Sequence, residues 1–375
     1  MPGAAETEVT VDRGSPFAQR PVLVFWETTR ACLLACRHCR AEAQRDPLPG
    51  ELSLTEARRL LQQIADFGRP APVVIFTGGD VLMRPDIFRL LDLAGSLGLR
   101  VAVAPSATPL LEEDAFRRFA DAGVHSLSLS LDGPEPVHDG VRGVPGTYRA
   151  VVRAIRQAHD AGLAVQINTV VMRSTAEHLA DVAALLLEEG IRVWEVFYLI
   201  ATGRALAAEY LAPQEWDDVC RFLLDTTRWG LLVRTVEGPF VRRVHQQSEL
   251  VAEPAGALYH RLRAHLEGLA GSPIRDVQMT RAGTLDGDGI VFVGYDGTIT
   301  PGGFLPVPLG NVRTDHLVDV YRSHPLLNEI RARRFVGPCG TCSFRRACGG
   351  SRARAFAATG DPLGSDPACA YLPRA

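Results

Sequence analysis

The chain has 375 residues, of which 46% are hydrophobic and 22% charged, and its formal net charge is −3. This apolar fraction excludes a mainly disordered chain, and the near-neutral charge argues against a surface built to bind nucleic acid. All 40 basic residues are Arg, so a Schiff base on an internal lysine is excluded. No apolar run is long enough for a membrane span, and residues 1–20 lack the apolar middle of a signal peptide. We therefore expect a cytoplasmic protein with no membrane or nucleic-acid partner.

The first predicted strand, at residues 22–26, leads into a loop with three closely spaced cysteines, Cys32, Cys36 and Cys39. In a reducing cytosol such cysteines bind metal or do redox chemistry more often than they form structural disulfides. Three thiolates are one fewer than zinc or a cubane cluster takes from protein. They can hold three irons of a [4Fe–4S] cluster and leave the fourth open to a small molecule. The alternative is a zinc loop completed by His38.

The second predicted strand, at residues 73–77, ends in Gly78-Gly79-Asp80. A β-branched and aromatic run of this kind predicts a buried parallel strand, and the glycines would let a ligand approach the backbone. On its own, the same string is typical of a plain β-turn.

Four more strands alternate with helices along the chain. The strands are predicted at residues 99–104, 126–132, 164–171 and 193–200, and the helices at 112–123, 147–162 and 176–190. In barrels of parallel strands, the functional sites lie at the C-terminal ends of the strands. The cysteine loop and the Gly-Gly-Asp string both follow such an end.

The cysteine loop, the Gly-Gly motif and this series of strands and helices resemble the radical S-adenosylmethionine (radical SAM) superfamily. The resemblance implies a partial (β/α)6 TIM-like barrel over residues 21–205, after a flexible tail at residues 1–20. It also implies that S-adenosylmethionine binds the open iron of the cluster and is cleaved reductively to a 5′-deoxyadenosyl radical. The cofactor contacts that it implies are Gly78, Gly79, Asp80 (in place of the usual Glu), Ser130, Asp132, Arg142, Asn168 and Leu199. Arg142 could instead order a loop through an ion pair, and Asn168 could cap a turn.

Residues 206–285 are predicted to bridge the barrel to the C-terminal part and to cap the cavity, and so to set substrate choice. This segment carries a helix at residues 213–229, a strand at 231–236 and a polar stretch at 244–272. Cys220 lies within the helix beside apolar neighbours, which predicts a core thiol.

A second cysteine group, Cys339, Cys342, Cys348 and Cys369, lies near the C-terminus. From spacing alone, four thiolates fit either structural zinc or a fully ligated [4Fe–4S] cluster. The string from Cys348 to Ala355 resembles the SPASM-type domain of the radical SAM enzymes related to alternative-haem and denitrification-haem biosynthesis. We therefore predict a Cys-rich SPASM-like domain at residues 286–375. A full SPASM domain has a further cysteine where this chain has Gly302 and Gly303, so we predict one auxiliary [4Fe–4S] cluster rather than two.

Together these features predict a radical SAM enzyme that abstracts hydrogen from a small molecule, either a secondary metabolite or a tetrapyrrole. An external donor such as flavodoxin or ferredoxin would supply electrons, and the auxiliary cluster would transfer electrons or donate sulfur. Two alternatives remain open: a maturase of ribosomal peptides, and a non-catalytic zinc- or cluster-binding protein. The pattern assigns no catalytic side chain and no reaction outcome.

Overall fold

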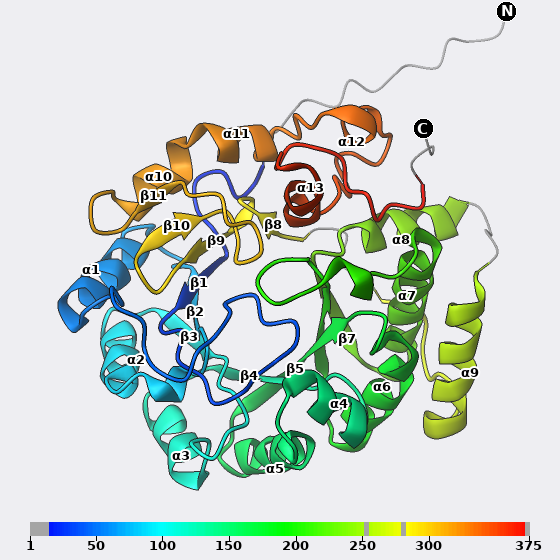
Figure 1. The fold of residues 1–375 in the computed structure, drawn as a ribbon, viewed down its shortest axis with the longest axis horizontal. Coiled ribbons are helices and arrows are strands. Elements are labelled where there is room, and N and C mark those ends of the chain that lie inside the picture. The colour runs from blue at the N-terminus through cyan, green and yellow to red at the C-terminus, as the bar shows by residue number, and fades with distance from the viewer. Residues whose placement is uncertain (1–14, 251–254, 279–282, 372–375) are drawn as a thin grey trace, which may run out of the picture.

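The computed structural model describes residues 15–250, 255–278 and 283–371. Seven parallel strands pair in chain order and curve into an open barrel (Figure 1). They are β1 (Leu23–Glu27), β2 (Val73–Thr77), β3 (Arg100–Val103), β4 (Ser126–Ser130), β5 (Ala164–Val171), β6 (Val193–Tyr198) and β7 (Leu232–Val236). The α/β fold and its parallel six-strand barrel are confirmed. β7 adds a seventh strand beside β6, so the sheet does not end at the predicted boundary at residue 205.

Buried and part-exposed side chains alternate along the strands, because one face of the sheet packs on helices and the other faces the barrel interior. In β4, Leu127 and Leu129 are fully buried, whereas the serines between them are part-exposed. The helices of the barrel surround it in Figure 1: α1 (Leu54–Ala65), α2 (Ile87–Ser96), α3 (Glu113–Asp121), α4 (Glu135–Arg142), α5 (Thr147–Asp160) and α6 (Leu179–Glu188). The first of these begins in a capping box, in which Ser53 and Glu56 satisfy each other's backbone N–H groups. Short 3-10 turns are η1 (Val81–Met83), η2 (Ala176–His178), η3 (Ala207–Glu209) and η4 (Thr227–Trp229).

The segment after β6 continues the outer helix layer. It forms α7 (Pro213–Thr226), α8 (Phe240–Leu250) and α9 (Ala257–Ala270). The last of these helices packs against α6 and α7 on the outside of the barrel (Figure 1). The stretch expected to be merely polar is therefore largely helical, and α9 lies away from the barrel mouth. None of the described helices is both long and apolar enough to cross a membrane.

The C-terminal part extends the barrel sheet. β9 (Gly289–Val293) pairs in parallel with the free edge of β1, in register from Leu23 with Ile290 to Trp26 with Val293. The other elements of this part are β8 (Leu285–Asp286), β10 (Thr298–Thr300), β11 (Gly310–Asn311), α10 (Leu317–Ser323), α11 (Pro325–Arg331), α12 (Gly337–Thr341) and α13 (Arg352–Thr359). The barrel and the cysteine-rich part are thus joined by strand pairing as well as by side-chain packing.

Part of the predicted flexible tail is tied to this C-terminal part. Residues 1–14 lie outside the described residues, but residues 15–20 are packed. Tyr321 Oη donates to the Phe17 carbonyl at 2.9 Å, and Arg322 Nε donates to the Gln19 carbonyl at 3.0 Å. The structure therefore attaches residues 15–20 to the C-terminal part through the carbonyls of Phe17 and Gln19, whereas the sequence predicts a flexible tail there.

Candidate active site

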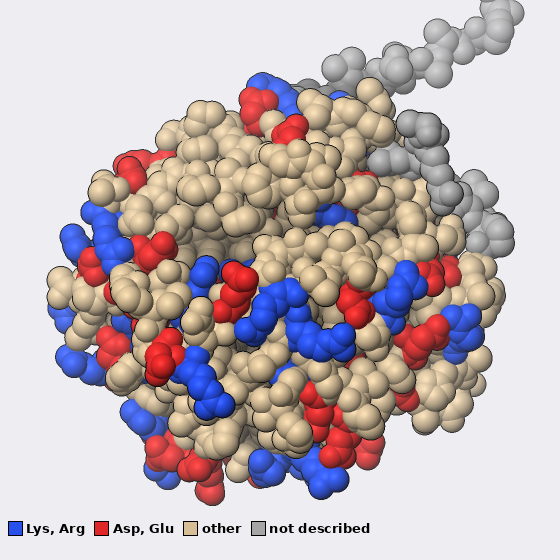
Figure 2. Space-filling model, in the orientation of Figure 1, with Lys and Arg blue, Asp and Glu red and all other residues tan. Residues whose placement is uncertain are grey.

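A cavity with about 1130 Å³ of open space lies at the C-terminal ends of the strands, and Cys32, Cys36 and Cys39 all line it. The molecule is hollowed where the C-terminal elements meet the barrel mouth, with basic and acidic side chains at the rim (Figure 2). All three cysteines are free thiols. The structure thus brings the three predicted cluster ligands to one wall of one cavity.

Arg204 holds the cysteine loop in place. Its Nε donates to the Cys36 carbonyl at 3.0 Å and its Nη1 to the Ala43 carbonyl at 3.1 Å. Arg204 Nη2 and His38 Nδ1 are buried and have no partner among the described residues. Burial lowers the pKa of His38 to about 4, so its imidazole is neutral at pH 7. A loop of three soft thiolates with unpaired donors nearby fits a cluster that carries a polar small-molecule ligand.

Gly78 and Gly79 line the cavity, and both are packed against the loop that precedes the first cysteine. A Cβ atom on Gly78 would lie 2.3 Å from the Thr29 carbonyl oxygen, and one on Gly79 would lie 2.2 Å from that of Ala31. The Gly79 N–H donates to the Thr29 carbonyl at 2.8 Å. Glycine is therefore needed at both positions, because the backbone of residues 78–79 packs directly on that of residues 29–31. The absence of side chains also leaves the glycine backbone open to a ligand.

Asp80 lies behind the cavity wall and is not among the residues that line it. Its carboxylate accepts hydrogen bonds from Leu82 N at 3.1 Å and Thr108 Oγ1 at 2.8 Å. Burial raises the pKa of this carboxyl. Asp80 also receives the backbone N–H of Ser106 at 3.4 Å, and Ser106 Oγ donates to the Gly79 carbonyl at 3.2 Å. The structure therefore gives Asp80 a positioning role behind the Gly-Gly motif.

Ser106 lines the cavity with its hydroxyl 3.7 Å from Cys32 Sγ, and the sequence analysis missed it. The only signal that could have found it is its place directly after β3.

Asp132 and Arg142 form an ion pair that orders the wall beside the cysteine loop. Asp132 is fully buried and accepts from Arg142 Nε at 2.8 Å and from the Val170 N–H at 3.0 Å. Burial opposes ionisation of Asp132 and is the largest single influence, but Arg142, the neighbouring histidines and the Val170 N–H together outweigh it, so the pKa of the carboxyl is lowered. Arg142 lines the cavity and its Nη1 lies 3.8 Å from Cys36 Sγ. The loop-ordering ion pair therefore exists, and the same guanidinium also faces the cavity.

Ser130, Asn168 and Leu199, three of the predicted cofactor contacts, line the cavity. Asn168 lies within β5, so it does not cap a turn. Its Oδ1 accepts from Gln166 Nε2 at 2.9 Å, and that amide also donates to Glu195 Oε2 at 2.9 Å. This chain of polar groups fixes the orientation of the Asn168 amide at the cavity.

The expectation that residues 206–285 cap this cavity is wrong. Among the described residues, those that line the cavity lie before this segment or after it. Phe304 of the C-terminal part lines it instead, with its ring 6.0 Å from that of Phe197. The described part of the bridging segment does not contribute to the cavity wall, because its helices pack on the outside of the barrel.

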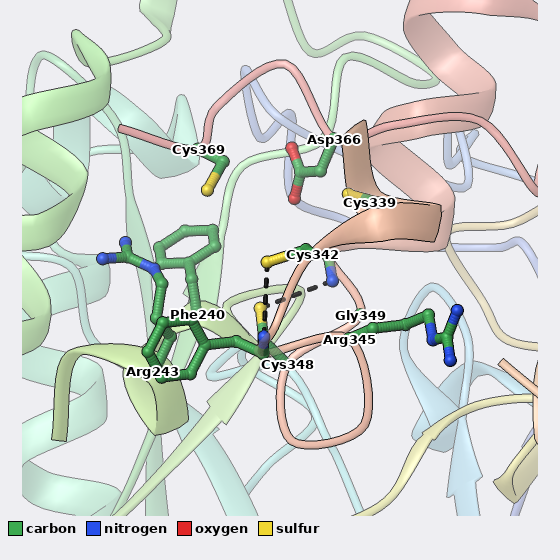
Figure 3. A pocket seen from close by; sticks show the side chains of 11 residues that line it. Phe240, Arg243, Cys339, Cys342, Arg345, Cys348, Gly349, Asp366 and Cys369 are labelled. Carbon is green, nitrogen blue, oxygen red and sulfur yellow. Dashed lines mark hydrogen bonds between the residues drawn. The ribbon is translucent and has the colours of Figure 1, made fainter. Parts of the chain in front are cut away.

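A second, smaller cavity with about 330 Å³ of open space is lined by Cys339, Cys342, Cys348 and Cys369. Figure 3 shows the four side chains around this space, with Phe240 and Arg243 of α8 on one side. Cys342 Sγ accepts from the Phe344 N–H and Cys348 Sγ from the Gly350 N–H, each at 3.4 Å. Backbone N–H groups of this kind are the usual neighbours of cluster-binding sulfurs. Within the part of the chain that the structure describes, no group of three or more Cys, His, Asp or Glu side chains is arranged to hold a single metal ion.

A buried ion pair fastens the second cysteine group to the barrel. Arg354 Nη1 donates to Asp366 Oδ2 at 3.0 Å, and both side chains are fully buried. Asp366 also accepts from the Ser351 and Ala368 N–H groups, and Arg354 Nη2 donates to the Glu237 carbonyl at 2.9 Å. The Cys369 segment is thereby held against the end of β7.

One aromatic pair joins the linings of the two cavities. Tyr198 lines the large cavity, Phe240 lines the small one, and their ring centroids are 5.1 Å apart. Tyr198 Oη lies 3.1 Å from the sulfur of Cys220, which is fully buried in the core as predicted.

The sequence profile of the radical SAM superfamily matches residues 26–186. Over 372 residues the chain is 36% identical to the AdoMet-dependent heme synthase of Nitratidesulfovibrio vulgaris, across 97% of this chain and 95% of that protein. The chain belongs to the radical SAM superfamily. It is an enzyme, and the cofactors of this family are S-adenosylmethionine (AdoMet) and a [4Fe–4S] cluster.

Other relatives place the chain in the haem-biosynthesis branch of the superfamily. It is 31% identical to the AdoMet-dependent heme synthase of Methanosarcina barkeri, across 94% of this chain and 97% of that protein. It is 29% identical to the pre-heme d1 synthase of Dinoroseobacter shibae, across 98% of this chain and 89% of that protein.

The fold is also shared with solved structures. Streptococcus suis SuiB bound to precursor peptide SuiA superposes with a TM-score of 0.69 at 18% identity, covering 94% of this chain and 76% of that one. The structure described as native anSMEcpe with bound AdoMet gives a TM-score of 0.66 at 16% identity, covering 92% of this chain and 93% of that one. These likenesses bear out the predicted barrel with a C-terminal SPASM-type part.

Proposed function

We propose that this radical SAM enzyme acts on a carboxylate-bearing tetrapyrrole in haem formation. The observation that carries the proposal is end-to-end similarity to AdoMet-dependent heme synthases, at 36% identity in the nearest of those cited above.

Cys32, Cys36 and Cys39 would hold the catalytic [4Fe–4S] cluster, which when bound supplies the electron for reductive cleavage of S-adenosylmethionine. The chain's own groups bind and orient this cosubstrate. The exposed backbone of Gly78 and Gly79 offers carbonyl oxygens to its ammonium group. Arg142, fixed by Asp132, offers a guanidinium to its carboxylate. Ser130, Asn168 and the Leu199 backbone complete the pocket.

We assign the second cavity to an auxiliary [4Fe–4S] cluster held by the four C-terminal cysteines. Four thiolates with two backbone N–H···S contacts support this assignment. The contact between Tyr198 and Phe240, which joins the linings of the two cavities, supports a role of the auxiliary cluster in electron transfer, with sulfur donation as the alternative. An external reductant of the flavodoxin or ferredoxin type would serve the catalytic cluster.

For the domain organisation, we propose a barrel that runs through β7 at residue 236. The helices α8 and α9 join it to a SPASM-like part at residues 286–375.

The proposal is tested with anaerobically reconstituted enzyme, S-adenosylmethionine and a reductant. Iron coproporphyrin III, which carries four propionates, is the probe. We expect 5′-deoxyadenosine to form together with tetrapyrrole products of lower mass by loss of carbon dioxide and hydrogen, detected by mass spectrometry.

A peptide is the second candidate substrate. It is favoured by similarity to the PqqA peptide cyclase of Bradyrhizobium diazoefficiens, at 26% identity, and to mycofactocin maturase MftC of Mycobacterium ulcerans, at 30%. An unchanged tetrapyrrole, with mass change only in an added precursor peptide, would replace the first proposal by this one.

A further inference from the structure

Arg40 lines the large cavity on the side of β1 and β9, whereas Ser130 and Asn168 line it from β4 and β5. Its Nη2 donates to Glu27 Oε1 at 2.8 Å, and its guanidinium lies over the Phe292 ring at 4.6 Å from the centroid. One edge and one face of this guanidinium are therefore fixed by the protein. Arg40 and Phe292 are far apart in the sequence and are brought together where β9 pairs with β1.

Arg40 shares its carboxylate partner with a second arginine. Glu27 is buried, with a side chain only 1% exposed, and it also contacts Arg30, whose Nε lies 3.2 Å from Glu27 Oε2. The side chain of Arg40 keeps 20% of its surface exposed, and this surface contributes to the cavity wall.

Gly303 packs its backbone closely against the same pair. A Cβ atom there would lie 3.2 Å from Phe292 Cδ2 and 3.5 Å from Arg40 Nε. Glycine therefore lets this segment lie against Phe292 and Arg40, and it adds a third contact that fixes the guanidinium.

The other two guanidiniums on the cavity wall are engaged differently. Arg142 is paired with Asp132, and Arg204 donates to two backbone carbonyls. Arg40 has five N–H donors in a planar fork, which matches a carboxylate in two parallel hydrogen bonds.

We propose that Arg40, held by Glu27 and Phe292, binds a carboxylate of the substrate. The inference deepens the proposed function, on which it rests for the identity of the substrate. Arg40 is then a specificity-determining residue: it distinguishes tetrapyrroles with free propionates from those without them.

The test measures binding by the holoenzyme without reductant, using anaerobic equilibrium dialysis. The two probes are iron coproporphyrin III and its tetramethyl ester, which has the same macrocycle and no carboxylate. We expect Arg40→Gln to weaken binding of the acid by roughly 10- to 100-fold, the effect of losing a hydrogen bond between charged groups. Binding of the ester should not change. Arg40→Lys, which keeps the charge but loses the fork, should fall between wild type and Arg40→Gln.

Arg156→Gln is the matched control, because Arg156 pairs with Glu189 on the outside of the barrel and its side chain is 65% exposed. It should bind both probes as the wild type does. Iron content and S-adenosylmethionine affinity of each variant report on folding independently of the tetrapyrrole.

The outcomes separate the two proposals. If the wild type binds neither probe, the tetrapyrrole substrate is wrong and the inference falls with it. If the wild type prefers the acid but Arg40→Gln and Arg40→Lys retain that preference, the proposed function stands and the role of Arg40 is overturned.

Discussion

At the barrel mouth, charged side chains divide into those that hold loops together and those that face the cavity. Asp80 and Asp132 belong to the first kind, because both are fully buried behind the wall. Arg142 belongs to both, since it is paired with Asp132 and also lines the cavity. Residue spacing in the sequence found the glycines and the cysteines, but it could not separate these two roles.

Ser106 and Arg40 were not found from the sequence for a related reason. Ser106 acts through contacts with Gly79 and Cys32, and Arg40 through Phe292, which lies far along the chain. Neither contact follows from local periodicity or motif spacing. The candidate site was therefore predictable where a short motif carries it and not where tertiary packing creates it.

The three cysteines of the first loop should be indispensable for cosubstrate cleavage. Replacing any of Cys32, Cys36 or Cys39 with Ala removes one of only three thiolates, and we expect loss of about four irons per chain and of 5′-deoxyadenosine formation. Iron analysis and chromatography of the reaction mixture check this. Cys220→Ala is the control, since that thiol lies in the core against Tyr198, and it should keep both clusters. Cosubstrate cleavage by a Cys36→Ala protein would refute the assigned ligands.

His138 should make stability depend on pH. Burial lowers its pKa from 6.5 to about 4 in the folded chain, where Nδ1 accepts the Asp132 N–H at 3.2 Å. Between these two values the unfolded state binds a proton that the folded state does not, so stability falls as pH drops from about 6.5 towards 4.

In His138→Gln this proton linkage is absent. We therefore expect the pH slope of the unfolding free energy to be smaller than in the wild type by up to about 1.4 kcal/mol per pH unit. Denaturant titrations at pH 7, 6 and 5 measure the slopes. His38 has its pKa lowered in the same direction and contributes to both proteins, so the difference isolates His138. Equal slopes would show that His138 is protonated in the folded state.

At the scale of the elements, α13 connects the second cysteine group to the barrel. Its Arg354 reaches Asp366 on one side and the Glu237 carbonyl on the other. In contrast, α9 packs on α6 and α7 at the outside of the barrel and does not line the cavity. The sequence predicted a helix, a strand and a polar stretch for residues 206–285, but not which side of the barrel they cover. That choice is made by packing partners, not by amphipathicity alone.

Breaking the buried pair should release the auxiliary site selectively. Arg354→Met leaves Asp366 buried without its counter-charge, which costs about 3–5 kcal/mol of unfolding free energy. We expect iron to fall from about eight to about four per chain, with the catalytic cluster retained. Iron analysis and chemical denaturation measure the two effects. Arg149→Gln removes an ion pair whose arginine side chain is 75% exposed, and it should change neither quantity appreciably. Full iron content in Arg354→Met would show that the pair does not support the cluster.

At the scale of the whole molecule, the sheet runs without a break from the C-terminal part into the barrel. Alternating patterns in the sequence predicted the six central strands and their parallel order. They could not predict that β9 pairs with β1, because the residues involved are separated by most of the chain. The fold class was thus readable from local patterns, while the junction of its two parts was not.

This junction should make the molecule unfold as one unit. A chain ending at residue 285 loses β9, which leaves the edge of β1 and the otherwise fully buried Trp26 without their cover. We expect the truncated chain to aggregate. The full chain should give coincident unfolding transitions by circular dichroism and tryptophan fluorescence. A soluble truncated chain that binds the catalytic cluster would show that the barrel is independent.

The pairing of β1 with β9 also has a consequence for biogenesis. The ribosome delivers the catalytic cysteines early, but their supports arrive late: Arg204 fastens their loop, and β9 closes the edge of β1. At roughly 5–20 residues per second, these thiols wait for tens of seconds on an unfinished nascent chain. During that time they are open to oxidation and to stray metal ions. We therefore expect the cluster to be inserted after synthesis of β9 rather than on the nascent chain.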